Sequence, residues 1–128
     1  MAFNILLVDD SKAIRSIIIK TLRLTKLDID QIYEAANGKE ALDVLLNNWI
    51  DLVLSDINMP VMTGIELVEE MAKDDLLKTI PVIIISTDGS TTRMDQLKSK
   101  GIKEYLRKPF LPESVGEKID KVLGVKHE

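Results

Sequence analysis

Three short apolar runs, none interrupted by a polar residue, limit the possible fold of this chain more than any other feature. They are Ile5–Val8, Leu52–Leu54 and Val82–Ile85. A strand with one solvated face alternates apolar and polar side chains. Unbroken runs of this length therefore indicate strands that are covered on both faces, as in a parallel sheet. Two weaker strand candidates are Gln31–Ala35 and Lys103–Arg107.

Apolar residues with helical spacing lie between these runs. We expect the first group, Ile14, Ile17, Ile18 and Leu22, to form one buried face of a helix. Three further groups follow the same spacing: Ala41, Leu42 and Leu45; Leu67, Val68 and Met71; and Val115, Ile119, Val122 and Leu123. A further helix over Thr91–Lys100 has only two clear apolar anchors, so we expect it to be thinly packed.

Capping signals support these helices. Asn37 and Thr63 are suitable N-caps, each followed three residues later by glutamate, and Pro112 suits a first helical turn. Strand and helix thus alternate five times, which predicts one α/β domain over residues 1–128. Its five-stranded sheet would be parallel, with right-handed crossovers.

Composition excludes several kinds of site. The 128 residues include no cysteine, so disulfides and thiolate metal sites are excluded, and the single histidine, His127, cannot build a histidine-centred triad. Any metal must therefore be held mainly by oxygen ligands. The net charge of −4 argues against nucleic acid as a partner. With no apolar run near the ~20 residues of a membrane span and no secretory signal, we expect a cytoplasmic protein without membrane insertion.

The residues that follow the strands carry the chemistry, because ligands of open parallel sheets bind at the carboxyl ends of the strands. These residues are Asp9 and Asp10, then Asp56, then Ser86, Thr87 and Asp88, then Lys108. Three converging carboxylates repel one another unless a cation neutralises them, and Mg²⁺ prefers oxygen ligands. A lysine and a hydroxyl suit phosphoryl oxygens. The combination indicates phosphoryl transfer through an aspartyl phosphate.

Each of these residues also has a purely structural interpretation. Asp9, Asp10 and Ser11 could cap the following helix, and Asp56 could begin a turn. Tyr105 fits a half-buried aromatic of a strand. Only the combination of these groups, in this order and at these strand ends, is specific.

Five segments together resemble the receiver domains of two-component response regulators, specifically the stand-alone chemotaxis (CheY-like) type. They are Val8–Ser11, Ala36–Leu42, Asp56–Gly64, Ile85–Thr87 and Lys108–Phe110, and they extend through essentially the whole chain. The resemblance implies a doubly wound, flavodoxin-like fold with strand order 2-1-3-4-5.

The resemblance also implies a role for each site residue. Asp56 would accept a phosphoryl group from a histidine kinase; Asp9, Asp10, Asp56 and the backbone carbonyl of Asn58 would hold Mg²⁺ or Mn²⁺; Lys108 and Ser86 would contact the phosphoryl oxygens; Ser86, Thr87 and Tyr105 would form the switch. Many relatives have alanine or glycine where this chain has Thr87, which puts its hydrolysis rate and partner fit in question.

Such a protein is a regulatory phosphoacceptor that catalyses part of its own phosphorylation and dephosphorylation, and is not a metabolic enzyme. Its signal would leave through the fourth helix, fifth strand and fifth helix to an effector, such as a flagellar switch component or a phosphorelay protein. Residues 93–128 contain nine basic and six acidic side chains, which suits an acidic or amphipathic partner segment.

Three other functions compete with this one. A receiver-like scaffold that binds partners constitutively would typically lack the acceptor aspartate or the lysine, and both Asp56 and Lys108 are present. A flavodoxin-like carrier would need a phosphate loop where Asp9 and Asp10 stand. A phosphatase with an aspartate nucleophile would place that nucleophile after the first strand in an Asp-x-Asp pattern.

Overall fold

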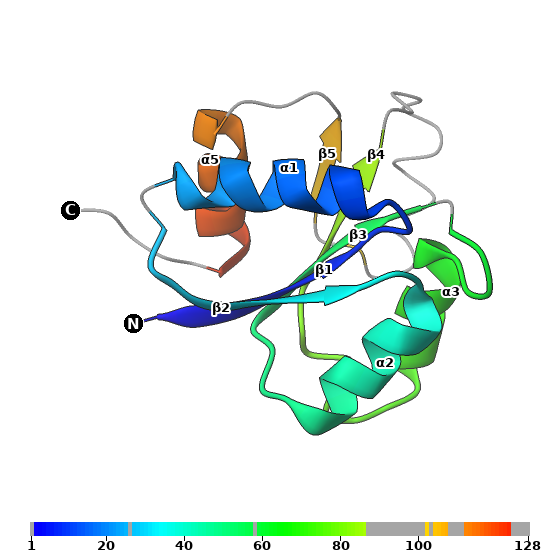
Figure 1. Ribbon diagram of the computed structural model, residues 1–128. Coiled ribbons are helices and arrows are strands. Elements are labelled where there is room, and N and C mark those ends of the chain that lie inside the picture. The colour runs from blue at the N-terminus through cyan, green and yellow to red at the C-terminus, as the bar shows by residue number, and fades with distance from the viewer. Residues whose placement is uncertain are drawn as a thin grey trace.

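A parallel five-stranded sheet forms the centre of the molecule (Figure 1). The computed structural model describes residues 2–25, 27–57, 59–86, 102, 104–107 and 112–123. The strands lie in the order β2-β1-β3-β4-β5, which confirms the expected topology. Their bounds are β1 Phe3–Val8, β2 Ile29–Ala35, β3 Leu52–Asp56, β4 Val82–Ser86 and β5 Glu104–Arg107.

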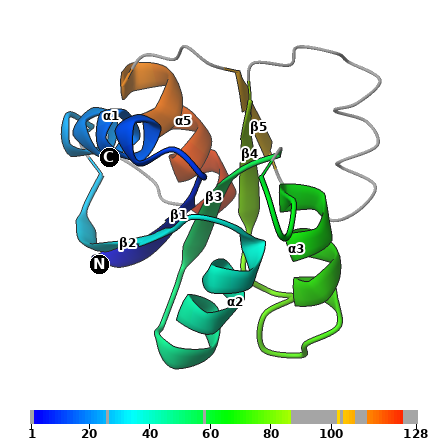
Figure 2. The same cartoon turned by 45° about the vertical axis from the view of Figure 1, so that its right-hand side comes forward.

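Helices cover both faces of the sheet. On one face lie α1 (Lys12–Arg23) and α5 (Pro112–Leu123), and on the other lie α2 (Gly38–Asn47) and α3 (Gly64–Ala72), as Figures 1 and 2 show. The helix expected over Thr91–Lys100 lies outside the described residues. In the part of the chain that is described, no helix combines the length and the apolar character that crossing a bilayer requires.

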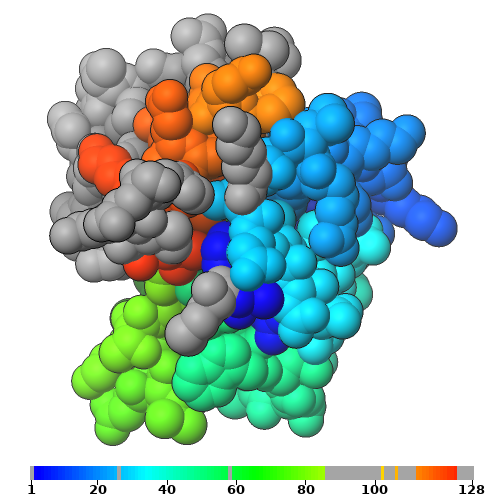
Figure 3. Space-filling view, turned by 90° about the vertical axis from the view of Figure 1, so that its left-hand side faces the viewer, coloured from blue at the N-terminus to red at the C-terminus, as the bar shows by residue number. Residues whose placement is uncertain are grey.

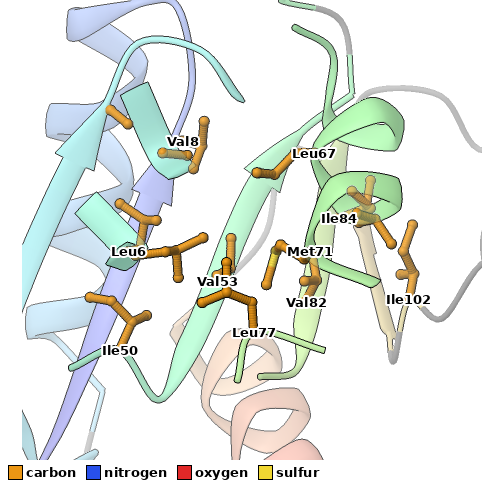
Figure 4. Packing of buried hydrophobic residues seen from close by; sticks show 14 of the residues in the cluster. Leu6, Val8, Ile50, Val53, Leu67, Met71, Leu77, Val82, Ile84 and Ile102 are labelled. Carbon is orange, nitrogen blue, oxygen red and sulfur yellow. The ribbon is translucent and has the colours of Figure 1, made fainter. Parts of the chain in front are cut away.

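The unbroken apolar runs follow from this three-layer arrangement. Successive side chains of a strand point to opposite faces. Ile5 and Leu7 pack with the α1 and α5 side of the core, whereas Leu6 and Val8 pack with the α2 and α3 side. Figure 4 shows the second of these clusters, in which Leu6, Val53 and Ile84 of three adjacent strands meet helix side chains such as Leu67. Because both faces are buried, neither can be polar.

The buried face of α1 differs from the face that the sequence predicts. Ile18 and Leu22 are buried as expected, but Ile17 is 60% exposed, and Ile19 packs against the core instead. The i, i+3, i+4 spacing is compatible with a buried face that is bordered by either Ile17 or Ile19. The placement of α1 beside α5 selects the edge that carries Ile19.

The predicted helix starts are confirmed. The side chain of Asn37 accepts a hydrogen bond from the Glu40 amide at 2.9 Å and caps α2. Thr63 and Glu66 form a reciprocal capping box at the start of α3. Pro112 is the first residue of α5. These caps fix where α2 and α3 begin, which is at the edge of the sheet where the strands end.

Candidate functional site

Three carboxylates meet at the carboxyl ends of two neighbouring strands. Asp56 is the last residue of β3, while Asp9 and Asp10 directly follow β1. Because Val8 of β1 pairs with Ser55 of β3, the residue after each of them lies at the same level of the sheet. One ligand oxygen from each carboxylate lies within 4.8 Å of the other two. The structure therefore confirms that these residues converge, as the sequence predicts.

The three carboxylates differ in their exposure to solvent. Asp9 is buried, with 2% of its surface exposed, Asp56 is half-buried, and Asp10 is exposed. Solvent therefore reaches the three carboxylates from the side of Asp10, which is the open side of the cluster. An oxygen-only donor set of this kind fits a hard divalent cation that keeps several of its waters, as Mg²⁺ does.

The backbone around Asp9 holds its carboxylate in position. The Asp9 amide donates to the Ala35 carbonyl at 3.1 Å, which ties Asp9 to the end of β2. Asp9 Oδ1 accepts the amide of Ser11 at 2.9 Å, and Ser11 Oγ accepts the amide of Ile14 at 3.2 Å. The capping interpretation of this segment is therefore correct for Ser11. Ser11 therefore caps α1 while Asp9 and Asp10 converge with Asp56.

Asp56 is held by its immediate neighbours in the chain. Its Oδ1 accepts the amide of Ile57 at 2.8 Å, and its carbonyl accepts the hydroxyl of the fully buried Ser55 at 2.9 Å. The Gly64 amide donates to the Ile57 carbonyl at 2.9 Å. A Cβ at Gly64 would lie 2.2 Å from the carbonyl oxygen of Asp56. The start of α3 thus packs directly on the backbone of Asp56, and only glycine fits there.

The loop between Asp56 and α3 contains a strained residue. Val61 has φ = 68°, a left-handed conformation that β-branched residues rarely adopt. The amide of Met62 donates to the carbonyl of Pro60 at 2.7 Å, so Val61 is the centre of a tight three-residue turn. The Gly38 amide donates to the Met62 carbonyl at 3.1 Å, which attaches this turn to the start of α2. The strained turn thereby joins two helix starts beside the carboxylates.

The remaining residues of the expected site are only partly described. Ser86 ends β4, the neighbour of β3, one residue beyond the Asp56–Ile85 pair. Tyr105 lies in β5 opposite Ile84. The side chains of Ser86 and Tyr105 lie outside the described part of the structure, and so do residues Asn58, Thr87 and Lys108 entirely.

Arg15 is a residue of this site that sequence reasoning missed. Its Nη1 donates to the carbonyl oxygen of Asp9 at 2.5 Å, and its Nε donates to Glu34 Oε1 at 3.0 Å. The Arg15 side chain is only 13% exposed. It ties the backbone between β1 and α1 to the end of β2. The available signal was a basic residue one helical turn beyond Ser11.

Comparison with known proteins agrees with this geometry. The family model described as response regulator receiver domain matches residues 5–120. The chain is 37% identical to the chemotaxis protein CheY homolog of Campylobacter jejuni, over 94% of this chain and 92% of that protein. It is also 37% identical to chemotaxis protein CheY1 of Helicobacter pylori, over 94% of this chain and 97% of that protein.

A solved structure extends the agreement to three dimensions. The chemotaxis response regulator CheY4 of Vibrio cholerae superposes with a TM-score of 0.85 at 33% identity, covering 96% of this chain and 100% of that one. Receiver domains are regulatory phosphoacceptors whose signalling depends on phosphorylation, and they bind Mg²⁺ in an acidic site. With its sequence, its fold and its three converging carboxylates in agreement, the chain belongs to the response regulator receiver-domain family, of the CheY-like chemotaxis type.

Proposed function

We propose that Asp56 accepts a phosphoryl group from the phosphohistidine of a kinase, in a reaction that requires Mg²⁺ or Mn²⁺, and that this protein then signals to a protein partner. One observation carries the proposal: the Asp56 carboxylate lies at a strand end within 4.8 Å of the oxygens of Asp9 and Asp10. An acceptor beside two further carboxylates suits a reaction that needs a cation, and the open side at Asp10 provides access.

The transfer exchanges one bond for another. A carboxylate oxygen of Asp56 attacks phosphorus, an O–P bond forms, and the N–P bond of phosphohistidine breaks. The bonding electrons return to the histidine ring, which takes a proton from solvent. Asp9, Asp10, Asp56 and the carbonyl of Asn58 would hold the cation, which offsets the negative charge of the carboxylates and of the phosphoryl oxygens.

The conformational response would involve the neighbouring strands. We assign Lys108 and Ser86 to the phosphoryl oxygens, and Ser86, Thr87 and Tyr105 to the switch. A phosphoryl group adds negative charge and strong acceptor oxygens, which can draw a hydroxyl and its loop inward. The effector would bind the side of the molecule that includes β5 and α5. The CheY-type relatives support a chemotaxis role, with a flagellar switch component as one candidate effector and a phosphorelay protein as another.

Intact-mass analysis tests the acceptor. The wild type, Asp56→Asn and the control Asp43→Asn are incubated with acetyl phosphate, with and without Mg²⁺. Asp43 is an exposed carboxylate on α2, well suited as a control for the loss of one acidic group. We expect a gain of one phosphoryl group in the wild type and in Asp43→Asn, only with Mg²⁺. Retention of the full gain in Asp56→Asn would contradict the proposal.

Cation binding is tested separately by isothermal titration calorimetry with Mg²⁺. Replacing Asp10 by asparagine removes the most accessible carboxylate of the three without disturbing the buried Asp9. We expect a loss of affinity of roughly tenfold or more, together with slower phosphorylation at the same Mg²⁺ concentration. Unchanged affinity in Asp10→Asn would show that the cation is held elsewhere.

The constitutive scaffold remains the alternative, and the same samples distinguish it. A protein that binds Mg²⁺ but gains no phosphoryl group from acetyl phosphate is next incubated with a phosphorylated histidine kinase of the same organism. Transfer to the wild type but not to Asp56→Asn would establish a kinase-dependent switch. No transfer from any phosphodonor would favour the scaffold.

A further inference from the structure

An apolar groove lies at the opposite edge of the sheet from the carboxylates. It has a volume of about 670 Å³ and is bounded by two segments, the end of α2 with its connection to β3 and the connection from α3 to β4. Figure 3 shows these two segments side by side at the lower edge of the molecule, blue-green and green respectively. The groove is thus formed where α2 and α3 end, whereas the carboxylates lie where these helices begin.

Large apolar side chains gather around this groove. Leu46 is 65% exposed, Trp49 is 78% exposed and Leu76 is 83% exposed, and all three line it. Four more buried side chains complete its apolar wall: Leu45, Ile50, Leu77 and Ile80. Single exposed apolar residues are common on protein surfaces, but a cluster that includes tryptophan around one groove indicates an interaction site.

The exposed tryptophan is fixed in position. Trp49 Nε1 donates to Asp51 Oδ1 at 2.9 Å, and the Trp49 carbonyl accepts Asn4 Nδ2 at 2.8 Å. Asp51 Oδ2 in turn accepts the Asn4 amide at 2.8 Å, so the start of β1 holds both residues. An indole that is already oriented loses little conformational entropy when a partner packs on it.

The opposite wall is held in a similar way. Asp74 Oδ1 accepts the amide of Leu76 at 2.8 Å and the amide of Leu77 at 3.2 Å. The amide of Lys78 donates to the Asp74 carbonyl at 2.9 Å. These bonds fix the short turn that presents Leu76 to solvent. The groove is therefore preformed on both sides.

The electrostatics of the groove favour a basic partner. The charged residues that line it are Asp74 and Asp75, and the nearby Lys78 is paired with Asp75 at 3.0 Å. The last turns of α2 and α3 contain no basic residue, whereas the last turn of α1 contains Lys20 and Arg23. Lys73, the C-cap residue of α3, pairs with Glu70 at 3.0 Å, so the negative helix end that lacks a basic side chain beside the groove is that of α2.

We propose that this groove binds an amphipathic helical segment of a partner protein, with bulky apolar side chains along one face and lysine or arginine residues on its flanks. Its apolar face would pack between Trp49 and Leu76, and its basic residues would lie near Asp74 and Asp75. A basic side chain could also stack on the indole of Trp49. The site is separate from the carboxylates, so this proposal does not depend on phosphorylation of Asp56.

Fluorescence titration tests the proposal, because Trp49 is the only tryptophan of the chain and lies in the groove. The probe is a synthetic helical peptide of about 16 residues with leucine at i, i+3, i+4 and i+7 and lysine elsewhere. We expect saturable binding with a blue shift of the emission. A second peptide with glutamate in place of lysine should bind at least about tenfold more weakly, because its charges oppose Asp74 and Asp75.

Matched variants locate the binding site, with calorimetry as the readout. Leu76→Ser should weaken binding of the lysine peptide about tenfold, whereas Leu24→Ser, which removes a similarly exposed leucine at the end of α1, should not. Asp75→Lys should weaken binding more than Glu117→Lys, which makes the same charge change on α5. Asp56→Asn should bind the lysine peptide with the affinity of the wild type. Peptide binding can therefore be tested independently of the proposed phosphorylation.

Three outcomes would overturn the proposal. The first is that the lysine peptide does not bind. The second is that Leu76→Ser and Leu24→Ser have the same affinity for the lysine peptide. This would show that the basic peptide adsorbs to the acidic protein without a specific site. The third is concentration-dependent self-association in sedimentation velocity that Leu76→Ser abolishes, which would assign the groove to a second copy of this chain.

Discussion

The two edges of the sheet are built from the same strands and helices but differ in chemistry. At the carboxyl edge Asp56 ends β3, Asp9 and Asp10 follow β1, and α1, α2 and α3 begin at side-chain caps. At the amino edge the connections present Leu46, Trp49 and Leu76 to solvent. Helix direction accounts for the carboxyl edge only, because helix starts stabilise negative charge.

The two edges also differ in how their parts are held. The carboxylates depend on close backbone packing, with α3 beginning against the carbonyl of Asp56. The amino edge depends on side chains, chiefly Asn4 and Asp51, which bond to the chain around Trp49. We therefore expect substitutions that disturb the packing or hydrogen bonds around Asp56 and Asp9 to have larger effects on stability and chemistry than substitutions at the amino edge.

Gly64→Ala should have the largest effect. Its methyl group would lie 2.2 Å from the Asp56 carbonyl, so the start of α3 must move away from β3. We expect the free energy of unfolding to fall by about 2–3 kcal/mol, measured by urea denaturation, and phosphorylation to slow. The control is Gly116→Ala on α5, where the nearest atoms lie 3.9 Å away. It should raise the free energy of unfolding by about 0.5–1 kcal/mol. Equal changes in the free energy of unfolding in the two variants would contradict the proposed close packing of α3 on Asp56.

Arg15→Met should have the next largest effect. It removes the bonds that connect the Asp9 carbonyl with Glu34, while keeping much of the apolar stem of the side chain. We expect Mg²⁺ affinity to fall by roughly tenfold and the free energy of unfolding to fall by about 1–2 kcal/mol. Arg23→Met, at the exposed end of the same helix, is the control for the loss of charge. Wild-type Mg²⁺ affinity in Arg15→Met would show that Arg15 only stabilises the fold.

Asp51→Ala tests the amino edge. It removes the acceptor of the Asn4 amide and of the Trp49 indole. We expect a loss of about 1 kcal/mol in the free energy of unfolding and a changed emission spectrum of Trp49, with phosphorylation of Asp56 unaffected. A large decrease in phosphorylation would mean that the two edges are coupled through β3, and the contrast drawn above would not hold.

Val61→Gly should have the smallest effect, in the opposite direction. Glycine adopts φ = 68° without strain but loses more conformational entropy on folding. The two terms nearly offset each other, so we expect a gain of only about 0.5 kcal/mol in the free energy of unfolding. Urea denaturation of Val61→Gly beside Val61→Ala checks this, because alanine keeps the strain. Greater stability of the alanine variant would show that strain at this turn is negligible.

The sequence predicted the architecture well because its signals are local. Unbroken apolar runs identified β1, β3 and β4 as strands covered on both faces, and the cap residues located the starts of α2 and α3. The parallel alternation then placed Asp9, Asp10 and Asp56 at the same edge. Each of these inferences requires only the spacing of residues and the directions of side chains in regular structure.

Other features required the tertiary structure. The exposure of Ile17 depends on how α1 sits beside α5, and the contacts of Arg15 depend on the distance from α1 to the end of β2. The close approach of Gly64 to Asp56 is also a long-range packing result.

The sequence by itself therefore determined the strands, the helix starts and the order of the acidic residues, because backbone periodicity and capping act within a few residues. Tertiary structure decided how tightly Asp56 is packed, which residue supports Asp9, and that Leu46, Trp49 and Leu76 share one groove. These depend on contacts between segments that are distant in the chain, and such contacts are fixed only when the layers pack together.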